Sequence, residues 1–330
     1  MVAMPPEQSL KQRPKKKDLP LFPIFPELSA DEASTYASGG IAWDSLSSDA
    51  ERDAAISHFM GTVLDFRHRH GRHFPWQQTR DPWPILLSEV MLQQTTTARV
   101  LEKYRLFLEI WPDFRSMASV SLVDLLAAWS GLGYNRRALA LRQTAIRSEE
   151  WGWTLPDDRE SLLSLPGIGA STAAAIRCFC YDLRDIYLET NVRRAVLHWF
   201  FPDEEGVKDK RIEPILLYAA KRVDDIRQWY YALMDYGVLL ARLVPNPNRR
   251  SSSYARQTAF KGSDREIRGR IIFMLTHQGP RDKVALMEAL GSSDEARLQS
   301  ILDALQAEGF IEERPASMAA ENSPLYGVKK

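Results

Sequence analysis

Apolar residues recur at helical spacing along most of the chain. Ser48 or Asp49 can cap the first such segment, which ends near Gly71 and carries its apolar positions three or four residues apart. The same spacing predicts further helices that begin at Trp83-Pro84 and extend near 97–111, 119–129, 135–150, 211–222 and 224–241. No stretch before residue 300 alternates apolar and polar positions convincingly, so the pattern predicts an all-α domain over residues 47–243.

The two ends of the chain follow different patterns. Residues 1–46 are rich in Pro, Ser and charge with little periodicity, and we expect a disordered or loosely packed basic arm. Residues 244–263 form a basic linker. Residues 264–330 predict three helices and two strands, a pattern typical of a small α+β winged-helix domain. The helices fall near 265–276, 282–290 and 294–308, and the strands near 310–312 and 325–328.

Composition places the chain among globular proteins without a membrane span. It has 330 residues, of which 45% are hydrophobic, and no apolar run approaches the ~18 residues that cross a bilayer. The two cysteines, Cys178 and Cys180, flank Phe179 in a pattern that favours a helix interior over a disulfide or a metal site. We therefore expect a reducing compartment and a cytoplasmic or nucleoid-associated protein.

Charge is balanced overall, with 43 basic and 43 acidic residues. A protein that binds nucleic acid needs a local basic surplus, and the stretches 11–17 and 249–270 are candidates. The first is compatible with contact to DNA backbone, with solubility or with an address signal. His68, His70 and His73 stand among arginines without an acid or cysteine to complete a metal site, so we interpret them as a basic edge.

The most informative stretch opens with Leu165-Pro166-Gly167-Ile168-Gly169. Pro166 fixes one φ angle, while Gly167 and Gly169 permit positive φ and close backbone approach, which predicts a tight turn between two helices. Amides exposed at such a turn suit a phosphate. About twenty residues later, Glu189 precedes a helix start at Thr190 or Asn191. The turn alone is equally typical of an ordinary helix–helix connection.

Two more motifs accompany this stretch, LSEVMLQQT at 87–95 and WSGLGY at 129–134. Together the three resemble, in order and spacing, the helix-hairpin-helix (HhH-GPD) superfamily of base-excision DNA glycosylases, and in particular its adenine DNA glycosylase (MutY-like) branch. The resemblance covers residues 50 to 243. It implies a monomeric enzyme that flips a damaged, mismatched or modified base out of double-stranded DNA and hydrolyses its N-glycosidic bond. A catalytically inactive protein for DNA binding or recruitment is the alternative.

The resemblance implies catalytic roles for Glu89, Glu189 and Asn191. Glu89 lies on an otherwise apolar helix, where desolvation would raise its pKa and favour a protonated acid. Glu189 precedes a helix start, where amides and the helix dipole would favour the charged form. Asn191 would orient that carboxylate or a water molecule.

The resemblance also assigns residues that hold the base and the DNA. Trp76, Leu92 and Ser171 would form the base pocket. Ser171 stands where bifunctional relatives carry a Schiff-base lysine, which predicts a monofunctional glycosylase. Six residues would contact DNA: Gln94 as the inserted wedge, Tyr134 at the partner strand, Gly167 and Gly169 at a phosphate, and Arg249 and Arg250 at the backbone.

The sequence departs from the family pattern after Gly237. In this stretch relatives carry four cysteines that hold an iron–sulfur cluster, whereas this chain has no cysteine after Gly237. We therefore expect no cluster and no other cofactor or metal. Whether the hairpin binds a monovalent cation is not decided by the sequence.

The family's catalytic aspartate maps onto Glu189, which is one methylene longer. Either the backbone adjusts, or the substrate differs, or catalysis has shifted to Glu89.

The C-terminal segment departs as well, because the adenine branch usually carries a Nudix-like mismatch-reading domain there. The helix expected to serve for recognition, at 292–309, is more acidic than basic, so the winged-helix domain could bind either DNA or a protein partner. Without the mismatch-reading domain, the sequence does not determine which base is excised. Uracil, mismatched thymine, hypoxanthine and other modified bases are all candidates.

Overall fold

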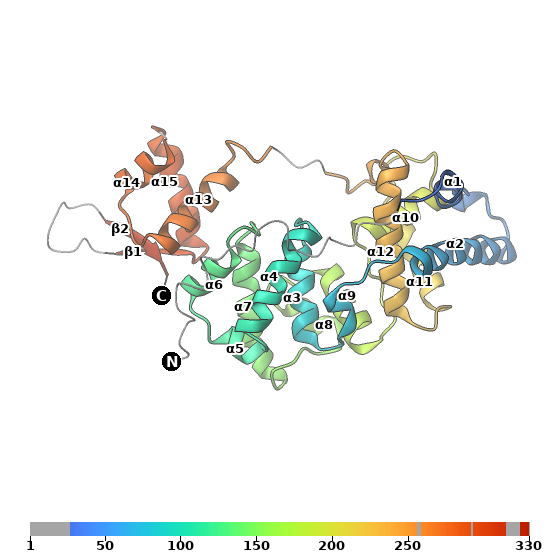
Figure 1. Ribbon diagram of the computed structural model, residues 1–330, viewed down its shortest axis with the longest axis horizontal. Coiled ribbons are helices and arrows are strands. Elements are labelled where there is room, and N and C mark those ends of the chain that lie inside the picture. Colours follow the sequence, from blue (N-terminus) through green and yellow to red (C-terminus); the bar gives the residue numbers. More distant parts are fainter. Residues whose placement is uncertain (1–26, 256–258, 292, 315–323, 330) are drawn as a thin grey trace.

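The computed structural model describes residues 27–255, 259–291, 293–314 and 324–329. The basic cluster at 11–17 and the connection between the two predicted strands lie outside this part. Its helices form three groups, with α1, α2 and α10–α12 at one end, α3–α9 in the middle and α13–α15 at the other end (Figure 1). No helix within the described residues is both long and apolar enough to span a membrane.

The first group is built around α2 (Asp49–His70) and α12 (Ile226–Leu243), with α10 (Thr190–Phe200) and α11 (Asp209–Ala220) beside them. Ser48 caps α2 as predicted. The end of α2 is joined to α12 by Asp235, whose side chain is almost fully buried. Its carboxylate accepts from Nη1 of Arg67 at 2.5 Å and from Nε and the amide of Arg72 at 2.8 Å each. Two cations and one anion are thus paired inside the fold.

Helix α1 (Ala30–Ala37) lies within the stretch that the sequence pattern assigns to a loosely packed arm, and here the structure differs. Tyr36 is buried against the first group, and its hydroxyl donates to Asp65 at 2.7 Å. The Tyr36 carbonyl accepts from the hydroxyl of Tyr236 at 2.7 Å. These contacts attach at least residues 30–37 to the helical core.

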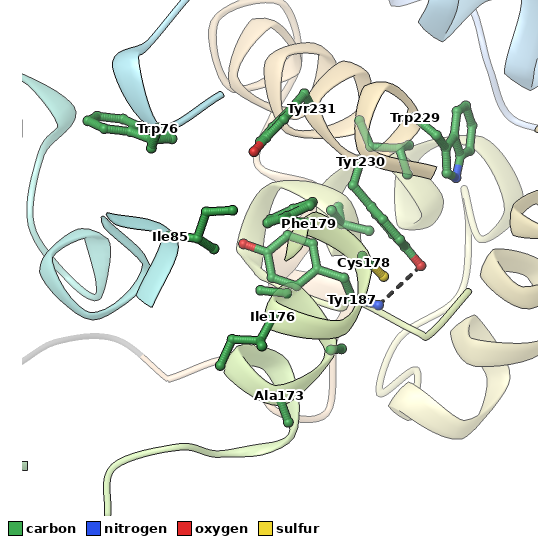
Figure 2. Close-up of a cluster of buried hydrophobic side chains, with 14 of the residues drawn as sticks. Trp76, Ile85, Ala173, Ile176, Cys178, Phe179, Tyr187, Trp229, Tyr230 and Tyr231 are labelled. Carbon is green, nitrogen blue, oxygen red and sulfur yellow. Dashed lines mark hydrogen bonds between the residues drawn. The ribbon is translucent and has the colours of Figure 1, made fainter. Parts of the chain in front are cut away.

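The middle group carries the sequence motifs. It consists of α3 (Pro82–Leu92), α4 (Thr97–Ile110), α5 (Phe114–Ala118), α6 (Leu122–Trp129), α7 (Arg136–Arg147), α8 (Arg159–Ser164) and α9 (Ala170–Tyr181). The helix predicted at 119–129 is shorter than expected, because Ser121 caps a new helix start. Buried aromatic residues of α9 and α12 meet where the first and middle groups join (Figure 2). Cys178 and Cys180 lie buried in α9 as free thiols, in agreement with the predicted helix interior.

The C-terminal unit contains α13 (Asp264–His277), α14 (Lys283–Leu290) and α15 (Glu295–Ala307). Strand β1 (Ile311–Arg314) pairs antiparallel with β2 (Leu325–Val328), and Ile311 lies opposite Val328. A second hydrophobic core lies between these elements and includes Leu122 and Leu126 of α6. The predicted elements are present, while their assignment to a winged helix stays a prediction.

Candidate active site

The hairpin between α8 and α9 holds its two glycines for different reasons. Gly167 has φ +73°, and a Cβ there would lie 2.7 Å from Cβ of Ala140, so the fold itself requires glycine. Gly169 has φ −92°, which any residue adopts, and a Cβ there would meet no described atom within 4 Å. Both glycines permit positive φ, and the structure has it at Gly167 but not at Gly169. No side chain caps the start of α9, which leaves space beside its first amides.

Glu89 projects from the apolar helix α3 and is only partly exposed. Its Oε2 accepts a hydrogen bond of 3.2 Å from the hydroxyl of Tyr187. Burial raises the pKa of Glu89 to about 8, the Tyr187 hydrogen bond opposes this, and the negative charge of Glu189 adds to it. At neutral pH this carboxyl is mostly protonated, as its position on an apolar helix predicts.

Tyr187 was not predicted from the sequence. It is 4% exposed and its ring packs edge-on against Phe179 and Tyr230. The hydroxyl of Tyr230 accepts from the amide of Tyr187 at 3.1 Å (Figure 2). The phenol that touches Glu89 is therefore held by packing and by its own backbone.

Glu189 is the N-cap residue of α10. Its Oε1 accepts from the amides of Asn191 at 2.7 Å and Val192 at 2.9 Å, and its Oε2 accepts from Nδ2 of Asn191 at 3.2 Å. Burial nevertheless raises the pKa of Glu189, although the two amides, Arg194 and Arg193 all oppose it. The amides at the helix start favour the charged form of Glu189, as expected. The net shift of its pKa is nevertheless upward, because desolvation outweighs the amides and the nearby cations.

Asn191 is held from the side opposite Glu189. Nη1 of Arg194 donates to Oδ1 of Asn191 and to the carbonyl of Gly237, both at 2.7 Å. A Cβ on Gly237 would lie 2.2 Å from the carbonyl oxygen of Asn191, so α10 begins in direct backbone contact with α12. The side-chain amide of Asn191 is thus held between Arg194, which donates to its oxygen, and Glu189, which accepts from its nitrogen.

Two of the predicted pocket residues form part of the core or its edge. Trp76 is 5% exposed, stacks on Phe74 with ring centroids 4.9 Å apart, and meets the edge of Tyr104 at 5.2 Å. Leu92 is half-buried at the end of α3. Both lie on or beside the elements that carry Glu89.

Ser171, the third predicted pocket residue, lines a cavity of about 240 Å³ together with Arg159, Leu188 and Glu213. Trp76 and Leu92 are not among the residues that line it. The structure thus joins Glu89 to Tyr187 and Asn191 to Glu189, and it places the two carboxyl groups near enough to interact. It does not place the three predicted pocket residues in one cavity.

Gln94 and Tyr134 are exposed at the ends of two neighbouring loops, and both have the left-handed backbone that L-residues seldom adopt, with φ 55° and 49°. The hydroxyl of Tyr134 accepts a hydrogen bond of 2.6 Å from Arg265 of α13. The C-terminal unit therefore touches Tyr134, one of the six residues predicted to contact DNA.

The loop that follows α12 supports α10 from both ends. Arg250 donates to the carbonyls of Pro202 and Leu197, and Asn248, which is 5% exposed, donates to the carbonyl of Thr190 at 3.1 Å. Arg250 is thus used inside the fold, contrary to the expectation that it contacts DNA backbone, whereas Arg249 is exposed.

An iron–sulfur cluster does not fit the loop that follows α12, because the loop has no cysteine and both cysteines of the chain are buried in α9. Nor do the described residues place three or more His, Cys, Asp or Glu side chains around a possible metal ion.

Comparison with known proteins agrees with this arrangement. The profile of the HhH-GPD superfamily of base excision DNA repair proteins matches residues 87–217. The adenine DNA glycosylase of Mycobacterium tuberculosis is 32% identical over 275 residues, which cover 76% of this chain and 88% of that protein. The thymine/uracil-DNA glycosylase of Methanothermobacter thermautotrophicus is 30% identical over 144 residues, which cover 43% of this chain and 65% of the relative.

Among solved structures, a thermostable thymine-DNA glycosylase aligns with a TM-score of 0.50 and 24% identity over 56% of this chain and 87% of that one, a likeness of fold. The chain belongs to the HhH-GPD superfamily of base excision DNA repair proteins. Within the superfamily it falls in the branch of the adenine DNA glycosylases, and its enzyme class is that of the DNA N-glycosylases.

Proposed function

We propose that this protein removes one base from double-stranded DNA by hydrolysing the N-glycosidic bond, and that it leaves the DNA strand uncut. The observation that carries the proposal is a pair of half-buried carboxyl groups, Glu89 and Glu189, which lie near enough for the charge of Glu189 to raise the pKa of Glu89. Two carboxyl groups of different protonation are what cleavage of a glycosidic bond needs.

Glu89 acts as the acid in this scheme. With a pKa of about 8 it carries a proton at neutral pH, and it delivers that proton to a ring nitrogen of the extruded base as the bond to C1′ breaks. The bonding electron pair leaves with the base, which departs as a neutral molecule.

Glu189 acts on the sugar. Loss of the base leaves positive charge on the ring, which stabilises the anionic form of Glu189 despite its burial. Its Oε1 is engaged by two amides, so Oε2, held by Asn191, is the oxygen that faces the chemistry. Water then adds to C1′ and gives its proton to a carboxylate, either Glu189 or the ionised Glu89.

Strand cleavage by a Schiff base requires an amine, and Ser171 has none, which supports the monofunctional assignment. Double-stranded DNA is the expected partner, with Gly169 and the start of α9 at a phosphate, Gln94 in the base stack and Tyr134 and Arg249 on the strands. We expect a monomer without an iron–sulfur cluster. The C-terminal unit is proposed as a winged helix that contacts DNA or a protein partner.

The base itself is to be identified by a panel of duplexes, each with one candidate: adenine opposite guanine or its oxidised form, uracil, mismatched thymine, or hypoxanthine. Alkali after incubation should cut the strand at one of these bases, while untreated strands stay intact. Breaks without alkali would contradict the monofunctional assignment.

Three variants then test the two carboxylates under single-turnover conditions. Glu89→Gln and Glu189→Gln should bind the chosen duplex normally and lose cleavage by orders of magnitude, because each removes a charge-stabilising or proton-donating group worth ~3 kcal/mol or more. Glu189→Asp shortens the side chain by one methylene, which draws the carboxylate back toward the backbone of residue 189, and it should also reduce cleavage. Failure of the wild type on every duplex, with normal DNA binding, would favour the inactive recruitment protein instead.

A further inference from the structure

Arg137, in the first turn of α7, lies between the end of α3 and the turn at 131–134. Its two terminal nitrogens lie within hydrogen-bonding distance of six acceptors on these two segments. Nη1 lies 2.7–3.0 Å from the carbonyls of Val90, Met91 and Gln93. Nη2 lies 2.9–3.2 Å from the hydroxyl of Thr95 and the carbonyls of Leu132 and Gly133.

This arrangement suits an arginine in particular. The last carbonyls of a helix have no partners within the helix and lie at its negative end, where a cation is stabilising. Two terminal nitrogens carry only four hydrogens, so six acceptors imply shared, three-centre bonds. The guanidinium also lies over the rings of Trp129 and Tyr134, at 5.3 and 5.5 Å from their centroids. A lysine ammonium has neither the span nor the planar shape to replace these contacts.

Two of the six acceptors have a special position in the chain. The carbonyl of Gln93 belongs to the peptide group that leads into Gln94, and the carbonyl of Gly133 belongs to the one that leads into Tyr134. Fixing a carbonyl fixes its peptide plane, which is one of the two planes whose relative orientation is set by φ and ψ of the next residue. Gln94 and Tyr134 are two of the described non-glycine residues with positive φ, a conformation that costs about 1–2 kcal/mol each and persists only where the surroundings impose it.

We infer that Arg137 is a positioning residue that holds Gln94 and Tyr134 in one preset geometry, ready to enter the duplex when the base leaves it. The inference rests on the proposed function, which places these two side chains against DNA. Holding them in advance removes an ordering cost that would otherwise be added to the few kcal/mol of unstacking a base. Arg137 thereby connects the helix that carries Glu89 to both loops that meet the strands.

The test uses Arg137→Lys and Arg137→Met in the full-length protein, with Arg105→Met on the exposed side of α4 as the control for the loss of one positive charge. Single-turnover cleavage is measured on two duplexes, one with the target base paired or mismatched and one with no base opposite the target. On the first duplex we expect the cleavage rate of both Arg137 variants to fall about 100-fold, which is the effect of misplacing a group by about 1 Å. On the second duplex, where extrusion is easy, their cleavage rates should be within a few-fold of the wild-type rate.

A double-mutant cycle separates positioning from a general loss of structure. Gln94→Ala should slow cleavage strongly in the wild-type background and only weakly in Arg137→Lys, because the wedge is already misplaced there. Equal losses on both duplexes, full additivity with Gln94→Ala, or the failure of both Arg137 variants to fold would overturn the inference.

A readout independent of cleavage keeps this test separate from that of the proposed function. 2-Aminopurine placed beside the target position reports unstacking by its fluorescence. Wild type and Arg105→Met should increase the emission, and both Arg137 variants should not. If no duplex is cleaved but this difference is seen, the proposed activity fails and the role of Arg137 stands. An increase with the Arg137 variants that equals that of wild type would refute the role whatever the activity.

Discussion

Replacing Tyr187 by Phe removes one hydroxyl from the candidate site and keeps the ring that packs against Phe179 and Tyr230. The lost hydrogen bond is 3.2 Å long and reaches Oε2 of Glu89. Hydrogen bonds to charged groups contribute about 1.5–3 kcal/mol, and at this length we take the lower end, close to the ~1.4 kcal/mol that corresponds to one pH unit.

The direction of the change follows from the donor. The phenol donates to the carboxylate and stabilises its charged form, so its removal raises the pKa of Glu89 above the present value of about 8. An acid works only while protonated, and cleavage therefore declines as pH rises through this pKa. In Tyr187→Phe the declining side of the pH–rate profile should move to higher pH by about one unit.

The assay is the single-turnover rate of base release from the duplex identified by the panel, measured across the pH range in which Glu89 titrates. Tyr230→Phe is the matched control, because its hydroxyl bonds to the amide of Tyr187 and the carbonyl of Asp185, not to Glu89. A midpoint that stays in place or moves to lower pH in Tyr187→Phe would refute the reasoning, as would an equal shift in the control.

Four further outcomes are expected. Asp235→Asn should lower the free energy of unfolding, measured in urea, by about 3–5 kcal/mol, since it leaves two buried cations without their anion; a loss under 1 kcal/mol would contradict this. Gly237→Ala should reduce cleavage about 100-fold by displacing Asn191, while binding of undamaged duplex persists; unchanged cleavage would show that the contact is not needed. Gly169→Ala should weaken duplex binding at low salt about 10-fold with little loss of thermal stability, and Gly61→Ala should not; equal affinities would remove the hairpin from the DNA interface. The purified protein should contain no stoichiometric iron and show no brown colour, and metal analysis decides this directly.

The helices could be predicted closely because their signals are local. Ser48 and Gly71 delimit α2 in the sequence as they do in the structure, and the strand pair at the C-terminus was also expected. Glu89 could be interpreted from its surroundings alone, because six of the helix's other ten residues are apolar and buried. Such features depend on neighbours within a few residues.

Features that depend on distant neighbours could not be predicted. The attachment of α1 depends on Tyr236, two hundred residues away from Tyr36. The internal use of Arg250 depends on where α10 ends, and the raised pKa of Glu189 depends on how far the folded chain removes its carboxyl group from water. Tyr187 gave no signal at all, since an aromatic residue in an apolar segment is ordinarily part of the core.

Helix α6 has apolar side chains on two sides, and this affects how the protein unfolds. Leu125 and Trp129 belong to the large core, whereas Leu122 and Leu126 belong to the core of the C-terminal unit. Melting that unit would expose an apolar strip on the remaining protein, and melting α6 would open both cores at once. The C-terminal unit and the rest of the protein therefore stabilise each other through α6. On heating, they should unfold in a single calorimetric transition instead of two.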